Sequence, residues 1–273
     1  MGSTASIGFT YWMRVCLLAV VLACGAAAAP AQSDEQHPKA AAEPGLEVPA
    51  GTILPVRLNH GFSSKTAVVG QAISARVMQD VPLPGGEKIP AGARLVGAVV
   101  SASSAQPGQA RGGNISFRFS QVQHGQQTFR ITANLRAIGS LLEVMEAQRP
   151  ETPAGFGTPY NWVTTNLIGG DVKYGVGGPV TDSGSQTVGE GTPDGVLVHV
   201  RAHSEGGCQG EPASSDRLQA LWVFSAGACG VYGIPQLRIV HAGRTPPVGE
   251  ITLAAEVGDV KLRAGMGLLL RVR

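Results

Sequence analysis

The chain has 273 residues, of which 43% are hydrophobic, so it is long enough to bury one sizeable core or two smaller ones. Its 21 Lys and Arg residues nearly balance its 19 Asp and Glu residues, and the arginines are scattered along predicted strands, as on a solvated face. Nucleic-acid and membrane-surface binding need clustered positive charge, so we predict neither kind of partner.

The first 31 residues have the features of an export signal. Arg14 precedes an apolar run of 15 residues, Val15–Ala29, which ends in small residues suited to cleavage. A spanning helix needs about 20 apolar residues, so we interpret 1–31 as a signal peptide and expect no transmembrane span in the mature chain. Alternatively, Val21–Cys24 resembles a bacterial lipobox, and lipidation of Cys24 would tether the protein to a membrane. Both routes predict a periplasmic or secreted bacterial protein, lipid-anchored in the second case.

A turn followed by a strand occurs three times in the chain. The copies begin at Val48, Ile89 and Leu262, and each has a glycine at its fourth position. Alternate residues after that glycine are apolar or small, which predicts a strand with one buried face. We expect the proline of the first two copies at the first central position of the turn, and the glycine at a positive φ.

The segments between the units predict further β structure. Residues 32–45 are polar and predict a disordered linker, whereas residues 46–138 are interpreted as the first part of a β-barrel. Within that part, alternating residues on both sides of His124-Gly125-Gln126 predict an antiparallel hairpin whose return strand runs to Leu135. Ser140–Glu143 has the spacing of a capping box and predicts a short helix, the only one expected in the mature chain.

Residues 139–247 are interpreted as a glycine-rich β lobe. Between Gly155 and Gly243, 18 of 89 residues are glycine, about 20% against a typical 7%. Leu218–Ser225 is apolar on both faces and predicts a buried strand. Residues 248–273 contain the third unit, so their strands are expected to return to the sheet of the first two. The sequence thus predicts an all-β fold, namely a distorted antiparallel β-barrel or sandwich with a Gly-rich β elaboration and at most one short helix.

Two cysteines, Cys208 and Cys229, remain after the signal peptide. In an oxidising compartment they predict a disulfide, and closing a loop of about 20 residues is worth about 3 kcal/mol. A thiolate nucleophile at Cys229 is the alternative, and it competes with the disulfide for the same sulfur. No Cys-x-x-Cys pair occurs, so no zinc or redox motif is predicted.

Other candidate residues do not form a recognisable catalytic pattern. His199 and His203 share a strand face but stand about 13 Å apart, too far for one metal ion. His241 is interpreted as a hydrogen-bonded structural residue, and the aspartates of the glycine-rich loops as turn formers. The sequence contains neither a phosphate loop nor a nucleophile elbow. We therefore predict no enzymatic activity, no cofactor and no metal site.

Aromatic side chains of the glycine-rich segment are candidates for a binding surface. Aromatic rings stack on sugars and on partner loops, and the candidates are Tyr160, Trp162, Trp222 and Tyr232. Packing in the core or at the rim of the barrel is the other interpretation of the same residues.

The order of these pieces resembles a known family. "VPAGTILPVRL", "KIPAGARLVGAVV", "ISFRFSQVQHGQQTFRI" and the terminal "VKLRAGMGLLLRV" are similar to the C-terminal β-barrel domain of the TrbI-like channel proteins of conjugative type IV secretion. The resemblance covers roughly Val48–Leu135 and Val260–Val272. It implies a periplasmic barrel that assembles into an envelope-spanning ring, and hence a homo-oligomer with envelope partners. No functional residue is carried over.

Three functions are consistent with these features. The first is an exported, non-enzymatic β-barrel module that is a structural or interaction component of the bacterial cell envelope. The second is a carbohydrate- or peptide-binding envelope protein that uses the glycine-rich lobe. The third is an envelope hydrolase that uses His or Asp residues of that lobe. The expected partner is an envelope protein or a glycan.

Overall fold

The structure is a computed structural model and describes residues 47–106, 108, 112–151, 157, 159, 162–201, 208, 211 and 214–273. The predicted signal peptide with Cys24, the predicted linker, Tyr160 and His203 lie outside the described residues. The described part is nearly all β, as predicted, and its one α-helix is α1 (Leu141–Glu146).

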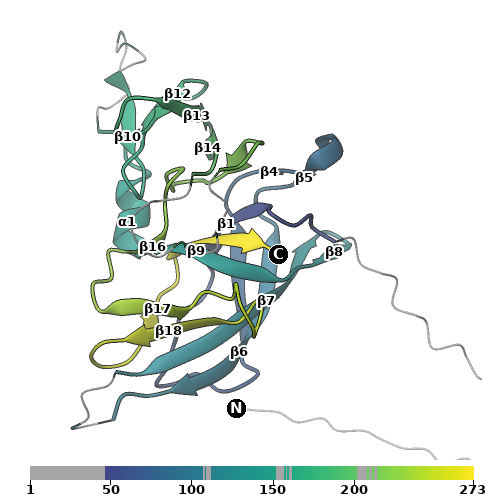
Figure 1. The fold of residues 1–273 in the computed structure, drawn as a ribbon, viewed down its shortest axis with the longest axis vertical. Coiled ribbons are helices and arrows are strands. Elements are labelled where there is room, and N and C mark those ends of the chain that lie inside the picture. Colours follow the sequence, from purple (N-terminus) through teal and green to yellow (C-terminus); the bar gives the residue numbers. More distant parts are fainter. Residues whose placement is uncertain are drawn as a thin grey trace, which may run out of the picture. The chain divides into compact units, whose positions relative to one another are not determined.

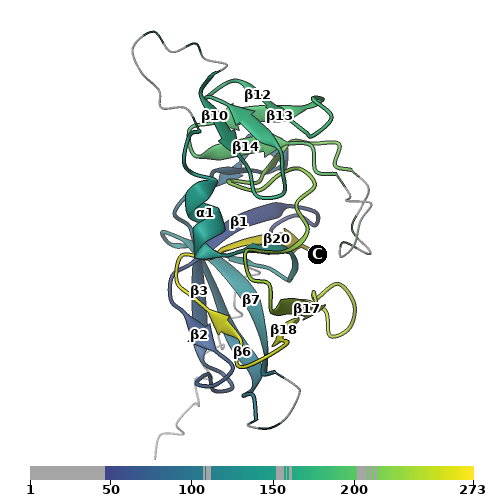
Figure 2. The same ribbon diagram turned by 90° about the vertical axis from the view of Figure 1, so that its left-hand side faces the viewer.

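A ten-stranded sheet curls into a nearly closed barrel (Figures 1 and 2). In spatial order its path is β16 (Gly230–Tyr232), β9 (Ala133–Gly139), β20 (Gly267–Val272), β1 (Ile53–Leu58), β3 (Ala72–Val77), β6 (Arg94–Ser103), β7 (Asn114–His124), β18 (Ile251–Ala255) and β17 (Leu237–His241), with β8 (Gln127–Arg130) paired to β7. Neighbours are antiparallel except for the parallel pair β16–β9. Near the seam, the Leu135 N–H of β9 donates to the carbonyl of Ala242, just after β17, at 2.8 Å.

The third turn-and-strand unit returns to the sheet of the first two, as predicted. Its strand β20 pairs antiparallel with β1, which pairs with β3, which in turn pairs with β6 of the second unit. The predicted inward residues are at most 3% exposed, and they are Thr52, Leu54, Val56, Leu58, Ala93, Leu95, Val99, Met266, Leu268, Leu270 and Val272. The period-two pattern therefore identifies the barrel interior correctly.

The turns differ from the prediction in one respect. The glycines Gly51, Gly92 and Gly265 have φ values of 84°, 89° and 88°, as expected. The closing hydrogen bond, however, runs from Thr52 N–H to the Pro49 carbonyl at 3.2 Å. Proline is therefore the first residue of the turn, not its first central residue. Because that position does not require a fixed φ, Arg263 can occupy it in the third copy.

A six-stranded antiparallel sheet forms the glycine-rich lobe. Its order is β10 (Thr164–Asn166), β11 (Val172–Tyr174), β12 (Pro179–Thr181), β13 (Thr187–Thr192), β14 (Gly195–Val198) and β15 (Gln219–Ala220). Each strand pairs with the next one along the chain, and the lobe lies above the barrel in Figure 1. The range 139–247 also contains β16 and β17, which belong to the barrel sheet.

Two apolar cores divide the buried side chains between them. The larger fills the barrel, and the smaller joins the outer face of the barrel to α1 and the lobe. Along β20, Leu268 and Leu270 belong to the first core and Leu269 to the second. This position between two cores explains why the strand is apolar on both faces, since neither face meets water.

The predicted hairpin is present but shorter than expected. β7 pairs with β8 through Gln121↔Arg130 to His124↔Gln127. The return strand ends at Arg130, and Ala133 begins β9, which pairs with β20 instead. The alternating pattern of apolar and polar residues continues across this break, although β9 buries both of its faces.

Residues 219–225 of the predicted buried strand Leu218–Ser225 are buried, but only Gln219–Ala220 is a strand. Trp222 has a φ of 55° and ends the extended conformation. Its N–H donates to the Gln79 side chain at 2.7 Å, and Gln79 donates in turn to the Val196 carbonyl at 2.9 Å. This buried glutamine satisfies the backbone groups that a continued strand would have paired.

The helix and two small sheets complete the fold. The Ser140 side chain caps α1 by accepting the Glu143 N–H at 3.2 Å, as predicted. The second bond of the predicted capping box does not form, because the Ser140 N–H donates to the Tyr232 carbonyl at 3.0 Å instead of to the Glu143 side chain. The small sheets pair β2 (Phe62–Ser63) with β19 (Lys261–Leu262), and β4 (Val81–Pro82) with β5 (Lys88–Ile89). None of the helices within the described ranges is long and apolar enough to cross a bilayer.

Candidate functional site

The described aromatic candidates do not form one binding surface. Trp162 is 60% exposed, whereas Trp222 is 2% exposed and belongs to the smaller core. Trp222 borders a cavity of about 140 Å³, which Lys173 and Asp194 also line but Trp162 and Tyr232 do not. The half-buried Tyr232 hydroxyl accepts the Cys229 N–H at 2.9 Å. Trp222 and Tyr232 therefore share a core, while Trp162 lies on the surface.

Two of the described histidines and both described cysteines make structural contacts. Cys208 and Cys229 form a disulfide with a Cα–Cα distance of 5.9 Å. His241 Nδ1 lies 2.6 Å from the Glu250 carbonyl, and its Nε2 lies 3.1 Å from the Thr245 hydroxyl. His199 contacts the Ser215 carbonyl. No group of three or more His, Cys, Asp or Glu side chains within the described residues could hold a metal ion.

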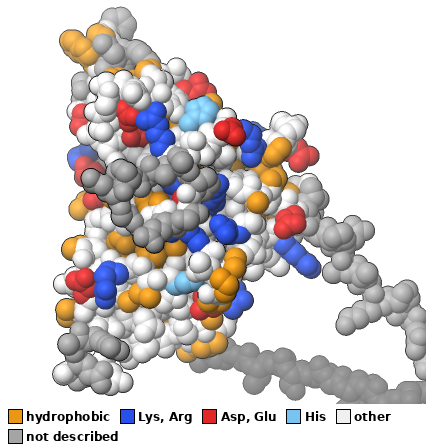
Figure 3. All heavy atoms as spheres, in the orientation of Figure 1, with side chains coloured by type: hydrophobic (Ala, Val, Ile, Leu, Met, Phe, Trp, Pro, Cys, Tyr) orange, Lys and Arg blue, Asp and Glu red, His pale blue; other side chains and the backbone are white. Residues whose placement is uncertain are grey.

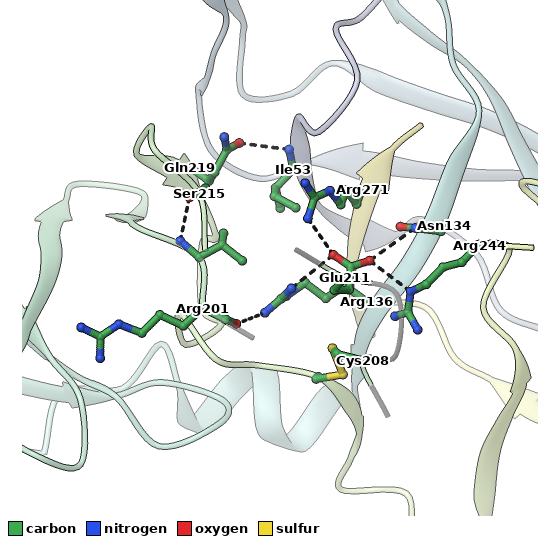
Figure 4. A network of polar contacts seen from close by, with 12 residues as sticks. Ile53, Asn134, Arg136, Arg201, Cys208, Glu211, Ser215, Gln219, Arg244 and Arg271 are labelled. Atoms are coloured by element: carbon green, nitrogen blue, oxygen red, sulfur yellow. Dashed lines mark hydrogen bonds and ion pairs between the residues drawn. A yellow bond between two sulfur atoms is a disulfide. The ribbon is translucent and has the colours of Figure 1, made fainter. Parts of the chain in front are cut away.

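The most connected polar group of the described chain is a buried carboxylate surrounded by arginines (Figure 4). Glu211 follows Cys208 of the disulfide by three residues, and its N–H donates to the Cys208 carbonyl at 3.0 Å. Three guanidinium groups reach its carboxylate: Arg271 at 2.9 Å, Arg244 at 3.1 Å and Arg136 at 3.3 Å. We call Glu211 and these three arginines the buried arginine cluster.

The barrel sheet positions two arginines of this cluster. Arg136 lies on β9 and Arg271 on β20, and Asn134 is the register partner of Arg271. The Asn134 amide also donates to Glu211, at 3.3 Å. These residues lie on the outer face of the barrel, because their neighbours Leu135 and Leu270 pack in its interior. Glu211 contacts this face through Arg136 and Arg271.

Burial strengthens the interactions between the charges of the cluster. The side chains of Arg136 and Glu211 are 0% exposed, and those of Arg244 and Arg271 are 12% and 16% exposed. Burial alone would raise the pKa of Glu211, but the hydrogen bond from Arg271 and the three positive charges outweigh it and lower the pKa below its ordinary value. Burial lowers the pKa of Arg136, and Glu211 opposes that effect.

The chemistry of the cluster follows from these contacts. Glu211 is ionised near neutral pH, so it has no proton to donate, and four hydrogen bonds occupy its oxygens. Arg136 also donates to the carbonyls of Arg201 and Ala226, at 2.6 and 3.2 Å. The cluster therefore fastens the loop between β14 and β15 to the barrel wall. Sequence reasoning missed it, because Arg136 and Arg271 occupy polar positions of alternating strands.

A second candidate is an apolar groove beside α1, which we call the α1 groove. It has a volume of about 370 Å³ and is bounded by α1, by the turn between β16 and β17, and by the segment from β18 to β20. Leu142 and Val257 line it and are 65% and 70% exposed. Lys261 and Arg263 also line it. The groove thus combines exposed apolar side chains with two basic ones, which is typical of a docking surface.

Comparison of the sequence with known families and curated proteins identifies no relative. No protein-family model matches the chain, and no curated protein matches its sequence. The function is therefore argued from the fold and its surfaces.

Proposed function

We propose that this protein is an exported, non-enzymatic β-barrel module that serves as an interaction component of the bacterial cell envelope. Three features support the proposal: the signal-like N-terminal sequence, the disulfide Cys208–Cys229 and the all-β fold. Disulfides persist mainly in oxidising compartments such as the periplasm.

The observation that carries the proposal is the α1 groove. Large apolar side chains exposed in a concave site lose contact with water when a partner binds, and each fully buried one contributes about 1.5–3 kcal/mol. The acidic residue of the groove, Asp259, accepts hydrogen bonds from the Ser64 hydroxyl and the Ala105 N–H. Lys261 and Arg263 form no ion pair with any described residue. The groove therefore fits an amphipathic segment of an envelope protein that carries both apolar and acidic side chains.

Site-specific photocrosslinking in cells tests this proposal. A photoreactive residue replaces Leu142 in the groove, and the matched control replaces Val240 of β17, which is 62% exposed and does not line the groove. We expect an adduct from position 142 and none from position 240. Mass spectrometry should place the crosslink on an acidic amphipathic segment, and a Lys261→Glu, Arg263→Glu variant should abolish it.

Several outcomes would refute the proposal. They are equal adducts from both positions, an adduct that survives the charge reversal, and a crosslink between two copies of this chain. The last result would make the groove a self-association surface.

A further inference from the structure

Three arginines stand side by side on the outside of the barrel. The strand register pairs Arg57 of β1 with Arg76 of β3, and Arg76 with Arg94 of β6. Adjacent strands lie about 4.8 Å apart, so the three side chains form a row across the sheet. The neighbouring residues on each strand point into the barrel core, so the arginines point outward. We call them the arginine row.

The arginine row has no acidic counterpart. Like charges directly opposite each other on a sheet are destabilising, and the row places two such pairs next to each other. Several other arginines pair with acids, as Arg118 does with Glu250 and Arg238 with Glu256, and on the face shown in Figure 3 basic and acidic side chains lie near one another. The side chains of the row form no hydrogen bond or ion pair with any residue that the structure describes.

The row lines a cleft rather than a flat surface. The cleft has a volume of about 580 Å³, and its other lining residues include Asn59, His60 and Ser74. No Asp or Glu is among its described lining residues. Three arginines therefore line a hollow that also contains a hydroxyl, an amide and an imidazole group. The Asn59 amide donates one hydrogen bond to the Ser74 hydroxyl at 3.1 Å, which leaves the second amide hydrogen and the hydroxyl hydrogen able to bond an anion.

We propose that this cleft is a binding site for a phosphate or diphosphate group, held by Arg57, Arg76 and Arg94. The planar fork of arginine matches the oxygens of a phosphate and donates two parallel hydrogen bonds to it. A phosphate monoester carries about −1.5 to −2 charges near neutral pH, whereas a carboxylate carries one. A multiply charged group offsets the repulsion within a row of three cations better than a single carboxylate does.

The phosphate can be part of a soluble molecule or of a lipid headgroup. The turn Arg263–Met266 separates the cleft from the α1 groove, since Ala264 and Gly265 line the cleft while Arg263 and Met266 line the groove. A phospholipid would place its phosphate against the row and its apolar part toward the groove. The phosphate chemistry is the same for both sources, and it does not depend on the function proposed above.

Titration of the full chain with two probes tests the site. Inorganic pyrophosphate represents the soluble source and is followed by calorimetry. Vesicles of phosphatidylcholine with or without phosphatidic acid represent the lipid source and are followed by sedimentation. Arg76→Gln removes the central arginine, and Arg130→Gln is the matched control, because Arg130 is an exposed arginine of β8 outside the cleft.

We expect Arg76→Gln to weaken binding of at least one probe by about tenfold or more, and Arg130→Gln to leave it unchanged within about twofold. Binding of pyrophosphate identifies a soluble ligand, and binding only of vesicles with phosphatidic acid identifies a lipid headgroup. The proposal is overturned if neither probe binds, or if Arg76→Gln binds as well as the unaltered protein. It is also overturned if citrate binds as tightly as pyrophosphate, or if an oligonucleotide binds more tightly than either probe.

Discussion

The buried arginine cluster and the arginine row use the same side chain in opposite ways. In the cluster, three arginines converge on Glu211, away from water. In the row, Arg76 and Arg94 are exposed and Arg57 is half-buried, and no described acid pairs with them. The cluster satisfies its charges within the fold, whereas the row leaves its charges available to an external anion.

This difference separates a structural role from a binding role. A buried charge without a partner is very costly, so the cluster exists only because Glu211 and its hydrogen bonds compensate the arginines. An exposed arginine loses little by lacking a partner, because water solvates it. The absence of an acid is therefore tolerated at the row, and it is there that a ligand can supply the missing negative charge.

The largest effect is expected from removing the charge of Glu211. Glu211→Gln leaves Arg136, with a fully buried side chain, without its carboxylate, and breaking a buried ion pair in this way costs about 3–5 kcal/mol. Urea denaturation followed by circular dichroism measures the loss.

The matched control is Glu256→Gln, which breaks an exposed pair with Arg238 at 3.5 Å. We expect this variant to lose no more than about 1 kcal/mol. If the two variants lost the same free energy of unfolding, the contrast between buried and exposed arginines would be wrong.

Acidification tests the same comparison, and the expected effect is smaller. The pKa of Glu211 is lowered: burial opposes this, but Arg271 and the other arginines dominate. For an acid whose pKa is lowered on folding, the added stability is present above its ordinary pKa of 4.5 and is lost as the pH falls through the folded value. We therefore expect the free energy of unfolding to decrease as the pH drops under 4.5. The difference in this free energy between the unaltered protein and Glu211→Gln should become smaller in the same range.

Asp171 provides a control, because its pKa shift has the opposite sign to that of Glu211. Burial raises its pKa, against a hydrogen bond from the Ala226 N–H, so its contribution to stability is present below its ordinary value of 3.8 and is lost as the pH rises. Asp171→Asn removes this opposing contribution, so the variant should lose stability more steeply on acidification. A shallower acid loss in that variant would contradict the assignment.

The sequence predicts the barrel well because alternate residues of its strands point into the barrel interior. Alternation in residues 52–58, 93–99 and 266–272 identified inward residues that the structure buries. The strand ends were less predictable: Trp222 interrupts an apolar run through a positive φ, and the Gln79 side chain makes the bend acceptable. That contact joins residues 143 positions apart, and no local pattern encodes it.

Neither arginine group could be predicted from the sequence. Arg136 and Arg271 alternate with apolar residues, as arginines on a solvated face do, and only the fold brings them to the buried Glu211. Arg57, Arg76 and Arg94 are scattered along the chain, and only the strand register places them in one row. Register depends on pairing between distant strands. The clustered positive charge, which we did not predict from the sequence, is therefore visible only in the fold.

The smallest expected effect decides whether the row is built for stability or for binding. Arg76→Gln relieves repulsion from both Arg57 and Arg94, so we expect it to stabilise the protein by about 0.2–1 kcal/mol at low salt. The gain should vanish near 1 M salt, where the screening length is only about 3 Å. Urea denaturation at both salt concentrations, with Arg130→Gln as the control, measures this gain.

A destabilised Arg76→Gln protein would mean that the row makes structural contacts like those of the cluster. A variant that is more stable yet binds phosphate less tightly would show that the three arginines are kept together for a ligand at a cost to the fold.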